Sequence, residues 1–347
     1  MLCNVEKKSY ICNNFANTMM NRKLAIYCVF LLALIKQGFG QDIHFSQIDI
    51  NPVLLNPAYS GFFEGKGRFG LVYRNQWASV SEPYETFAFT GEWNAYRRRY
   101  YGDGINVGLA LSADEAGSLG YGITQADAII SYFRGLNKAN NHFISAGLSL
   151  GMGQRSFNPI DAEMPERDEV FETTKATYVD LGVGIAWFYN PIDDFTIKVG
   201  LGAKHLNKPN ISYMQLDDIF LHPNYNAYTR MEIGLSENIS LLPAVVYKFQ
   251  NNYSELLYGL DVKWYGYGVS SHDVACAAGV YMRQTDAVVL CAALEFGPFV
   301  LGASYDYNFS DLKPARNGMG GFEIALGYRL NDGLEKRNRS IPCPTFL

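Results

Sequence analysis

The feature that most constrains the fold is a long alternation of apolar side chains with small or polar ones. From Gly65 onward, stretches of ten or so residues alternate in this way, and turn residues separate them. Between Val179 and Tyr189 every second residue is apolar, while the intervening face contains Asp180, Gly182 and Gly184. Successive side chains of a strand point to opposite faces, so this pattern predicts strands with a different environment on each side.

The character of the polar face separates a membrane barrel from a soluble β-sandwich. A sandwich carries many charges on its outer face and has strands of about five or six residues. Here the segments are longer and their polar faces are mostly Gly, Ser and Asn, with aromatics such as Trp77, Trp264 and Tyr328 toward segment ends. Because a bilayer admits no unpaired sheet edge, the sheet must close. We predict an all-β, antiparallel transmembrane β-barrel of the outer membrane, with a soluble β protein as the alternative.

The barrel is predicted to span residues 65–331 and to contain fourteen strands, an even number as in single-chain bacterial barrels. The two longest connections, 156–173 and 207–225, both follow odd-numbered strands and therefore lie at the same end. We expect that end to be outside the cell, with short turns in the periplasm. The expected strands are 66–79, 84–97, 104–113, 121–134, 141–155, 174–190, 194–206, 226–236, 238–249, 253–265, 271–284, 286–296, 299–310 and 320–331.

Charged residues on the polar faces are expected to point into the lumen. Both signs occur, so the charges can neutralise one another across the barrel, which a narrow lumen requires. Two interpretations stay open: a structural network that closes the pore, or a lining that selects solutes. The residues are Arg68, Arg74, Glu92, Asp180, Lys198, Lys204, Asp261, Lys263, Asp306, Glu323 and Arg329.

The N-terminus has the pattern of an export signal. The apolar run 24–35 follows Arg22 and Lys23 and precedes Gly38-Phe39-Gly40. A basic flank, a short apolar core and small residues before a cut are typical of a secretory signal peptide. We predict that residues 1–40, which include an N-terminal extension, are removed, whereas a buried N-terminal helix is the alternative.

Composition excludes several classes of protein. Charged residues make up 18% of the chain and aromatics 14%, which argues against intrinsic disorder. The formal net charge of −5 leaves no basic stripe for a nucleic acid. After the predicted cut only Cys276, Cys291 and Cys343 remain, too few for a disulfide framework.

Residues 41–64 form a turn-rich segment ahead of the first strand. Two Asn-Pro steps, Asn51-Pro52 and Asn56-Pro57, suppress regular helix and central strand here. With further motifs along the chain, this segment resembles the PorP/SprF family of the type IX secretion system, found in Bacteroidetes. The motif residues are Phe45, Ser46, Gln47, Asn51, Pro52, Asn56, Pro57, Ala58, Tyr59, Arg74, Gln76, Trp77, His205 and Pro209. Tyr305-Asp306-Tyr307-Asn308, Gly320-Gly321-Phe322-Glu323-Ile324 and the tail Cys343-Pro344-Thr345-Phe346 are also similar.

The resemblance implies a non-enzymatic outer-membrane component of the secretion system. Such proteins support secretion or surface attachment of a partner, a cargo with a C-terminal sorting domain such as a gliding adhesin. The expected partners are this cargo, other secretion components and outer-membrane lipids, with no cofactor and no nucleic acid. Residues 332–347 are expected to form a periplasmic tail. The main alternative is a passive diffusion channel for small solutes, and a third is an outer-membrane lipid hydrolase.

Two glycine motifs match enzyme patterns without their context. The sequence 65–70 fits GxGxxG but opens a strand, whereas dinucleotide binding needs a following helix. The sequence 147–151 fits the GxSxG of hydrolases, but it lies mid-strand and lacks the turn into a helix. Strand register could bring His142 or His205 near Ser149, which keeps the hydrolase hypothesis open.

The other candidate ligands are dispersed. The five histidines, His44, His142, His205, His222 and His272, show no metal-ligand spacing. Within 161–169, Glu163, Glu166, Asp168 and Glu169 form an acidic loop that could hold calcium, although a solvated loop is the simpler interpretation. We therefore predict no metal site and no catalytic residue.

Overall fold

The computed structural model divides the chain into two units, Met1–Asp42 and Ile43–Leu347, and the second contains the barrel. The predicted signal peptide, the acidic loop 161–169 and the predicted tail lie outside the described residues. The described ranges are 42–63, 65–76, 84–98, 102–116, 121–139, 141–157, 174–192, 194–213, 219–266, 274–284, 286–309 and 319–330.

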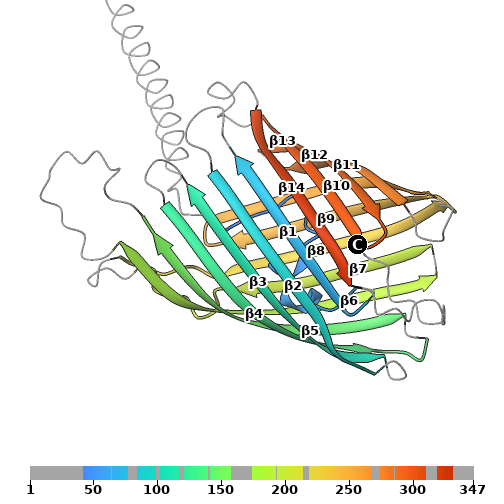
Figure 1. Ribbon diagram of the computed structural model, residues 1–347, viewed down its shortest axis with the longest axis horizontal. Coiled ribbons are helices and arrows are strands. Elements are labelled where there is room, and N and C mark those ends of the chain that lie inside the picture. Colours follow the sequence, from blue (N-terminus) through green and yellow to red (C-terminus); the bar gives the residue numbers. More distant parts are fainter. Residues whose placement is uncertain are drawn as a thin grey trace, which may run out of the picture. The chain divides into compact units, whose positions relative to one another are not determined.

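Fourteen antiparallel strands form one closed barrel, as the alternation predicts, and Figure 1 shows them following one another around the wall. Each strand pairs with its neighbours in the sequence, and β1 pairs with β14 to close the ring. The strands are β1 Gly67–Gln76, β2 Tyr84–Arg98, β3 Asp103–Ala116, β4 Tyr121–Gly135, β5 His142–Ser156, β6 Lys175–Ile192, β7 Phe195–Lys204, β8 Asn224–Ser236, β9 Ile239–Gln250, β10 Tyr253–Gly266, β11 Val274–Arg283, β12 Ala287–Phe296, β13 Phe299–Asn308 and β14 Met319–Leu330.

The two ends of the barrel differ in their connections. The connections after β5 and β7 are the two long ones, and both leave the same end, which we call the long-loop end. The β8–β9 and β12–β13 connections leave the opposite end, the short-turn end, where β1 begins and β14 stops. The predicted parity of the connections is therefore confirmed, and the register Gly67↔Leu330 to Gln76↔Gly321 closes the ring without a bulge.

The seventh strand is shorter than predicted. It stops at Lys204 because His205 adopts a left-handed backbone conformation, with φ of 57°, that no strand can continue. The eighth strand begins at Asn224, two residues earlier than expected. The other described strand ends lie within a few residues of the prediction.

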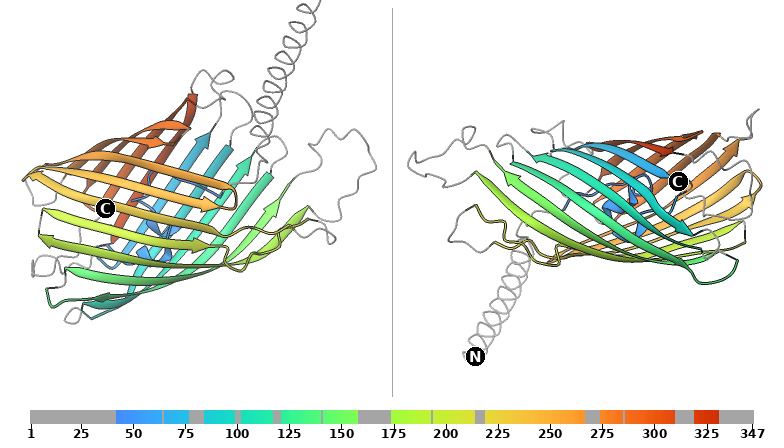
Figure 2. Two further views of the ribbon diagram at one scale, coloured as in Figure 1. Left: turned by 180° about the vertical axis from the view of Figure 1, so that it is seen from behind. Right: turned by 60° about the horizontal axis from the view of Figure 1, so that its bottom comes forward.

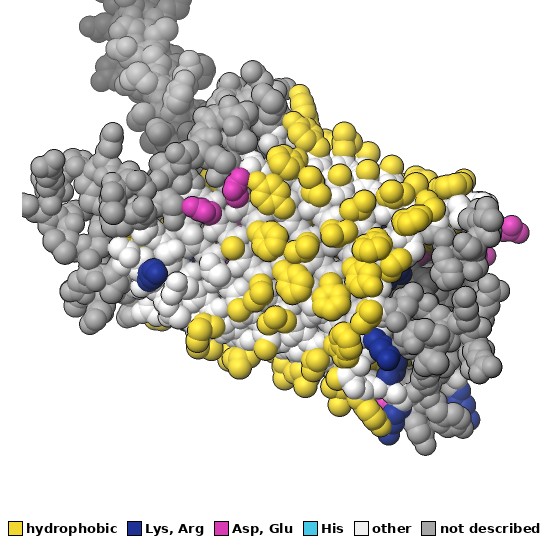
Figure 3. Space-filling view, in the orientation of Figure 1, with side chains coloured by type: hydrophobic (Ala, Val, Ile, Leu, Met, Phe, Trp, Pro, Cys, Tyr) yellow, Lys and Arg dark blue, Asp and Glu magenta, His cyan; other side chains and the backbone are white. Residues whose placement is uncertain are grey.

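The outer wall is apolar. On β5 the outward side chains Ile144, Leu148, Leu150 and Met152 are each about half exposed, from 46% to 60%. Figure 3 shows apolar side chains spread across the strands on one face of the barrel. An exposed apolar surface of this extent is what a lipid-facing barrel wall presents. Within the described part of the chain, no helix has the length and apolar character of a membrane span.

The inner face carries the predicted charges. Arg68, Glu92, Lys198 and Glu323 are among the most buried polar side chains of the protein. Two of the predicted lumen charges, Lys204 and Arg329, are partly buried. The interior therefore holds an ionic network beside apolar clusters, and a segment of the same chain lies within it.

Candidate functional site

The lumen is occupied by residues 43–63, which we call the lumen segment. Figure 2 shows it in blue within the ring of strands. Two short 3-10 helices shape it, η1 (Pro52–Leu54) and η2 (Pro57–Tyr59). Each begins with proline because the first helical position needs no backbone N–H and favours the fixed φ of proline. The side chain of Asn56 caps η2 by accepting a hydrogen bond from the N–H of Ala58 at 2.8 Å.

At the long-loop end, the barrel wall binds the backbone of the lumen segment. Glu323 of β14 accepts hydrogen bonds from the N–H groups of Ser46, at 2.9 Å, and Gln47, at 2.8 Å. The hydroxyl of Ser46 accepts from Arg74 of β1 at 3.2 Å and from Arg283 of β11 at 3.0 Å. The neighbouring strands β1 and β14, together with β11 further along the ring, therefore converge on two consecutive residues.

The same arginines neutralise the wall carboxylates beside them. Arg74 forms ion pairs with Asp306 at 2.7 Å and with Glu323 at 3.2 Å. Arg283 reaches Asp306 at 2.8 Å. All four side chains are almost fully buried, and a buried charge is tolerable when it is paired and hydrogen-bonded. This network includes the lumen segment. It therefore favours the interpretation of the interior charges as a structural network over their interpretation as a lining that selects solutes.

In the middle of the lumen, Asp49 of the segment holds three wall groups. Tyr228 of β8 donates to its carboxylate at 2.6 Å, and Lys198 of β7 donates at 3.3 Å. Arg230 forms an ion pair with Asp49 at 3.0 Å and also reaches Asp261 of β10 at 2.9 Å. The charge of Asp49 therefore fixes the depth of the segment in the barrel.

The two Asn-Pro steps bind the wall through their asparagines. Asn51 accepts a hydrogen bond from Thr90 of β2 at 2.5 Å. The amide of Asn56 donates to two wall carbonyls, those of Ile185 at 3.1 Å and Leu201 at 3.0 Å. Each step thus combines a proline that starts a turn with an amide that anchors it, which explains the local sequence.

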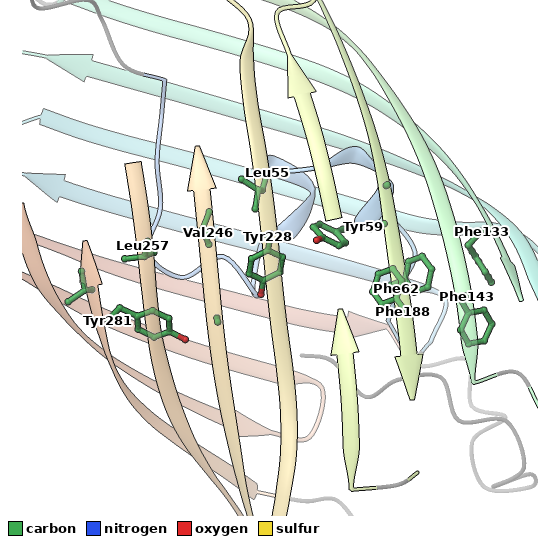
Figure 4. Close-up of a cluster of buried hydrophobic side chains, with 14 residues drawn as sticks. Leu55, Tyr59, Phe62, Phe133, Phe143, Phe188, Tyr228, Val246, Leu257 and Tyr281 are labelled. Atoms are coloured by element: carbon green, nitrogen blue, oxygen red, sulfur yellow. The ribbon is translucent and has the colours of Figure 1, made fainter. Parts of the chain in front are cut away.

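An apolar cluster includes Ala58 and Tyr59 of η2 and side chains of the wall, and Figure 4 shows it. The ring of Tyr59 meets Phe188 and Tyr228 edge to face, with centroids 5.9 and 5.6 Å apart. Phe62 stacks on Phe188 at 3.6 Å and contacts Phe133 at 5.2 Å. Such aromatic pairs contribute beyond the area they bury, so the segment is held by packing as well as by charge.

At the short-turn end, the wall again binds the backbone of the segment. The carbonyl of Ser60 accepts from Asn106 at 3.1 Å and from Ser131 at 2.9 Å. Glu92 of β2 accepts from the N–H of Gly61 at 3.1 Å and forms a buried ion pair with Arg68 at 2.7 Å. The segment is therefore bound along its whole length, from one end of the lumen to the other.

Lumen-facing glycines make room for the segment. A Cβ at Gly184 would lie 1.8 Å from the amide oxygen of Asn56, and one at Gly302 would lie 1.8 Å from that of Gln47. At Gly147 the obstacle is backbone, because the Cβ would lie 2.4 Å from the carbonyl carbon of Pro57. The small residues of the polar strand faces are thus complementary to the segment.

The motif residues outside the segment fall into two groups. Arg74 and Gln76 lie at the end of β1, Arg74 in the network around Ser46, and Trp77 lies outside the described residues. His205 lies 2.9 Å from Asp180 of β6, and Pro209 is buried and accepts a backbone hydrogen bond from Leu221. Of the first group Arg74 binds the lumen segment, and the second group folds the β7–β8 connection.

That connection packs against the wall at the long-loop end. Ile211 and Leu221 form a buried cluster with Tyr178 of β6. Tyr213 meets Phe157 edge to face at 4.9 Å, and burial, with Tyr121 beside it, raises the pKa of its phenol. The described part of this connection is therefore a fixed surface.

Several residues that hold the segment are not predicted from the sequence. Asp49 and Asn106 are not singled out there, and Arg230 and Arg283 are absent from the predicted lumen charges. The alternation within their own strands places both arginines inside. The contact of each with the segment, however, depends on where residues 43–63 lie, and no strand pattern contains that information.

The two enzyme-like glycine motifs lie in strands, without the turn into a helix that their chemistry needs. His142 lies on the outer face, where its ring accepts a hydrogen bond from Trp187 at 2.5 Å, whereas Ser149 lies on the lumen side of the same strand. Residues 67–70 of the GxGxxG match belong to β1. Within the described ranges no group of three metal-ligating side chains occurs.

A small cavity lies beside the segment. It measures about 80 Å³ and lies between residues 46–50 and the wall of β8 to β12, where Arg230, Asp261, Lys263 and Glu295 line it. A volume of this size holds a few water molecules, because one water needs roughly 10–15 Å³ of such space.

A closed fourteen-stranded antiparallel barrel with an apolar exterior and an occupied lumen defines a β-barrel of the outer-membrane type. Residues 37–328 match the family described as type IX secretion system membrane protein PorP/SprF. The chain therefore belongs to this family, which confirms the resemblance. Membership implies other components of the secretion system as partners.

Solved structures that are similar to the chain include a FadL homologue, a hydrocarbon channel and a porin. A Pseudomonas aeruginosa FadL homologue is 11% identical with a TM-score of 0.47, covering 82% of this chain and 94% of that one. The CymD monoaromatic hydrocarbon channel is 11% identical with a TM-score of 0.46, covering 85% and 95%. The KdgM porin is 10% identical with a TM-score of 0.35, covering 76% and 99%. No curated protein matches the sequence.

Proposed function

We propose that this protein is a closed, non-enzymatic scaffold of the type IX secretion system in the outer membrane. It would support the export or the surface attachment of a secreted partner, a cargo with a C-terminal sorting domain such as a gliding adhesin. The observation that carries the proposal is the occupied lumen. The chain fills its own pore with a segment bound to β1, β2, β7, β8 and β14.

The occupied lumen argues against a diffusion channel. A channel needs a continuous water-filled path through the barrel, whereas here buried side chains of the segment and the wall meet from end to end. The cavity of about 80 Å³ beside Asp49 is too small for such a path. A closed barrel that transports nothing still offers a rigid frame for other proteins.

The surface for a partner would lie at the long-loop end. Loops on a rigid frame are common recognition sites, and the described part of the β7–β8 connection is fixed by Ile211, Leu221 and the pair His205–Asp180. A cargo or a secretion component would dock against this surface.

Gene deletion tests the cargo role. Removing the gene should abolish the surface display of a large protein encoded beside it while other type IX substrates are still secreted. Complementation with the wild-type gene is the control, and display that persists in the deletion strain would refute the role. In planar bilayers the purified protein should be silent, and a large steady conductance would favour the channel instead.

A further inference from the structure

The lumen segment has a fixed direction. Its first residues lie at the long-loop end, where the ring of His44 lies 3.5 Å from the guanidinium of Arg74. Arg74 is near the last residue of β1, and Arg283, which binds Ser46, is the last residue of β11. Both strands run toward the long-loop end.

The last residues of the segment lie at the other end. Phe62 contacts Phe143, the second residue of β5, and Phe133, close to the end of β4. Phe63 lies under Arg68, the second residue of β1, with 5.1 Å from the guanidinium carbon to the ring centroid. These positions belong to the short-turn end, where β1 starts.

We propose that the chain crosses the outer membrane once more, inside its own lumen, and opens at Ile43 onto the cell surface. This inference rests on the proposed function, because that proposal places the long-loop end outside. Ile43, the first residue of the lumen segment, then lies at the end of the barrel where the long loops meet an exported partner, although β1 itself begins at the periplasmic end.

The contacts leave no freedom to reverse the segment. Glu323 accepts from two consecutive backbone N–H groups, those of Ser46 and Gln47, at the long-loop end. Asn106 donates to the carbonyl of Ser60 near the short-turn end. Because donors and acceptors are paired at both ends with Asp49 bound between them, a segment inserted from the other side would break all of these bonds.

Cysteine labelling of intact cells tests the proposal. Four single variants, Ile43→Cys, Asn252→Cys, Lys66→Cys and Glu237→Cys, are made in a background without the native cysteines and treated with a membrane-impermeant maleimide-biotin. Asn252 lies in the β9–β10 turn at the long-loop end, whereas Lys66 and Glu237 lie at the short-turn end. Heat-shifted migration in SDS gels confirms that each variant is folded.

We expect Ile43→Cys to label in intact cells to the same extent as Asn252→Cys. Lys66→Cys and Glu237→Cys should label only after the outer membrane is permeabilised. If Asn252→Cys labels in intact cells but Ile43→Cys needs permeabilisation, the inference is overturned and the proposed function stands. If Asn252→Cys itself needs permeabilisation, the orientation is reversed, and both the inference and the proposed docking surface are wrong.

Discussion

Phe62 of the lumen segment stacks face to face on Phe188 of β6, with ring centroids 3.6 Å apart and planes within 9° of each other. The two residues are 126 positions apart in the sequence (188 − 62), yet their rings meet near the short-turn end of the lumen. Phe188 sits at a lumen-facing position of a strand whose outer face is apolar. An aromatic ring on that side is therefore explained by the segment and not by the lipid.

Phe62→Ala should loosen the closure at the short-turn end. Removing a buried aromatic side chain costs about 3–5 kcal/mol. Because Phe62 belongs to the lumen segment, the loss weakens the binding of the segment to the wall and leaves strand pairing intact. We expect brief conductance events in planar bilayers where the wild type is silent. Leu148→Ala, at a lipid-facing position that is 58% exposed, is the control and should stay silent. A silent Phe62→Ala protein would mean that this contact does not close the lumen.

Asp49→Asn should weaken the centre of the closure. The change removes a carboxylate that pairs with both Lys198 and Arg230, and Arg230 keeps its ion pair with Asp261. Breaking a buried pair from one side costs about 3–5 kcal/mol. The measurement is the frequency of openings in planar bilayers, which should rise. Glu237→Gln, in an exposed turn, should leave it unchanged, and equal frequencies in the two variants would contradict the role of Asp49.

Gly147→Ala should displace η2. The added methyl would lie 2.4 Å from the carbonyl carbon of Pro57 and 2.5 Å from the nitrogen of Ala58, so backbone must move. We expect a lower temperature for the heat-induced shift in SDS gels. Gly108→Ala is the matched control, because the nearest atoms there lie at 3.4 Å, an ordinary contact. Equal transition temperatures would show that the segment adjusts without cost.

The effects of Arg74→Gln and Glu323→Gln on the free energy of unfolding should not be additive. The double variant should lose less stability than the sum of the losses in the two single variants. The single change leaves two buried carboxylates, Asp306 and Glu323, short of a positive partner, and contacting residues are not additive. Guanidinium unfolding in liposomes followed by tryptophan fluorescence gives the free energies. Arg134→Gln, on an exposed side chain, is the control. Strict additivity would argue that the pair is not coupled.

The wall of the barrel follows from the sequence, whereas the contents of its lumen do not. Alternation gives the strand count, the faces and most of the interior charges, since each strand reports its own two environments. In the alternation pattern, Gly184 and Gly302 indicate only that one strand face is small or polar. They match Asn56 and Gln47, and that match depends on contacts more than a hundred residues apart, which local periodicity does not encode. The two Asn-Pro steps predicted an ordered turn-rich segment but not its location.

The seam between the first and last strands has a consequence for biogenesis. Ser46 receives a hydrogen bond from Arg74 of β1 and gives its backbone N–H to Glu323 of β14. Ser46, which precedes the barrel in the sequence, thus binds both of the strands that must pair to close the ring. We expect that the pairing of β1 with β14 and the insertion of the lumen segment are one cooperative event, so that a chain lacking residues 43–47 would stall as an open sheet.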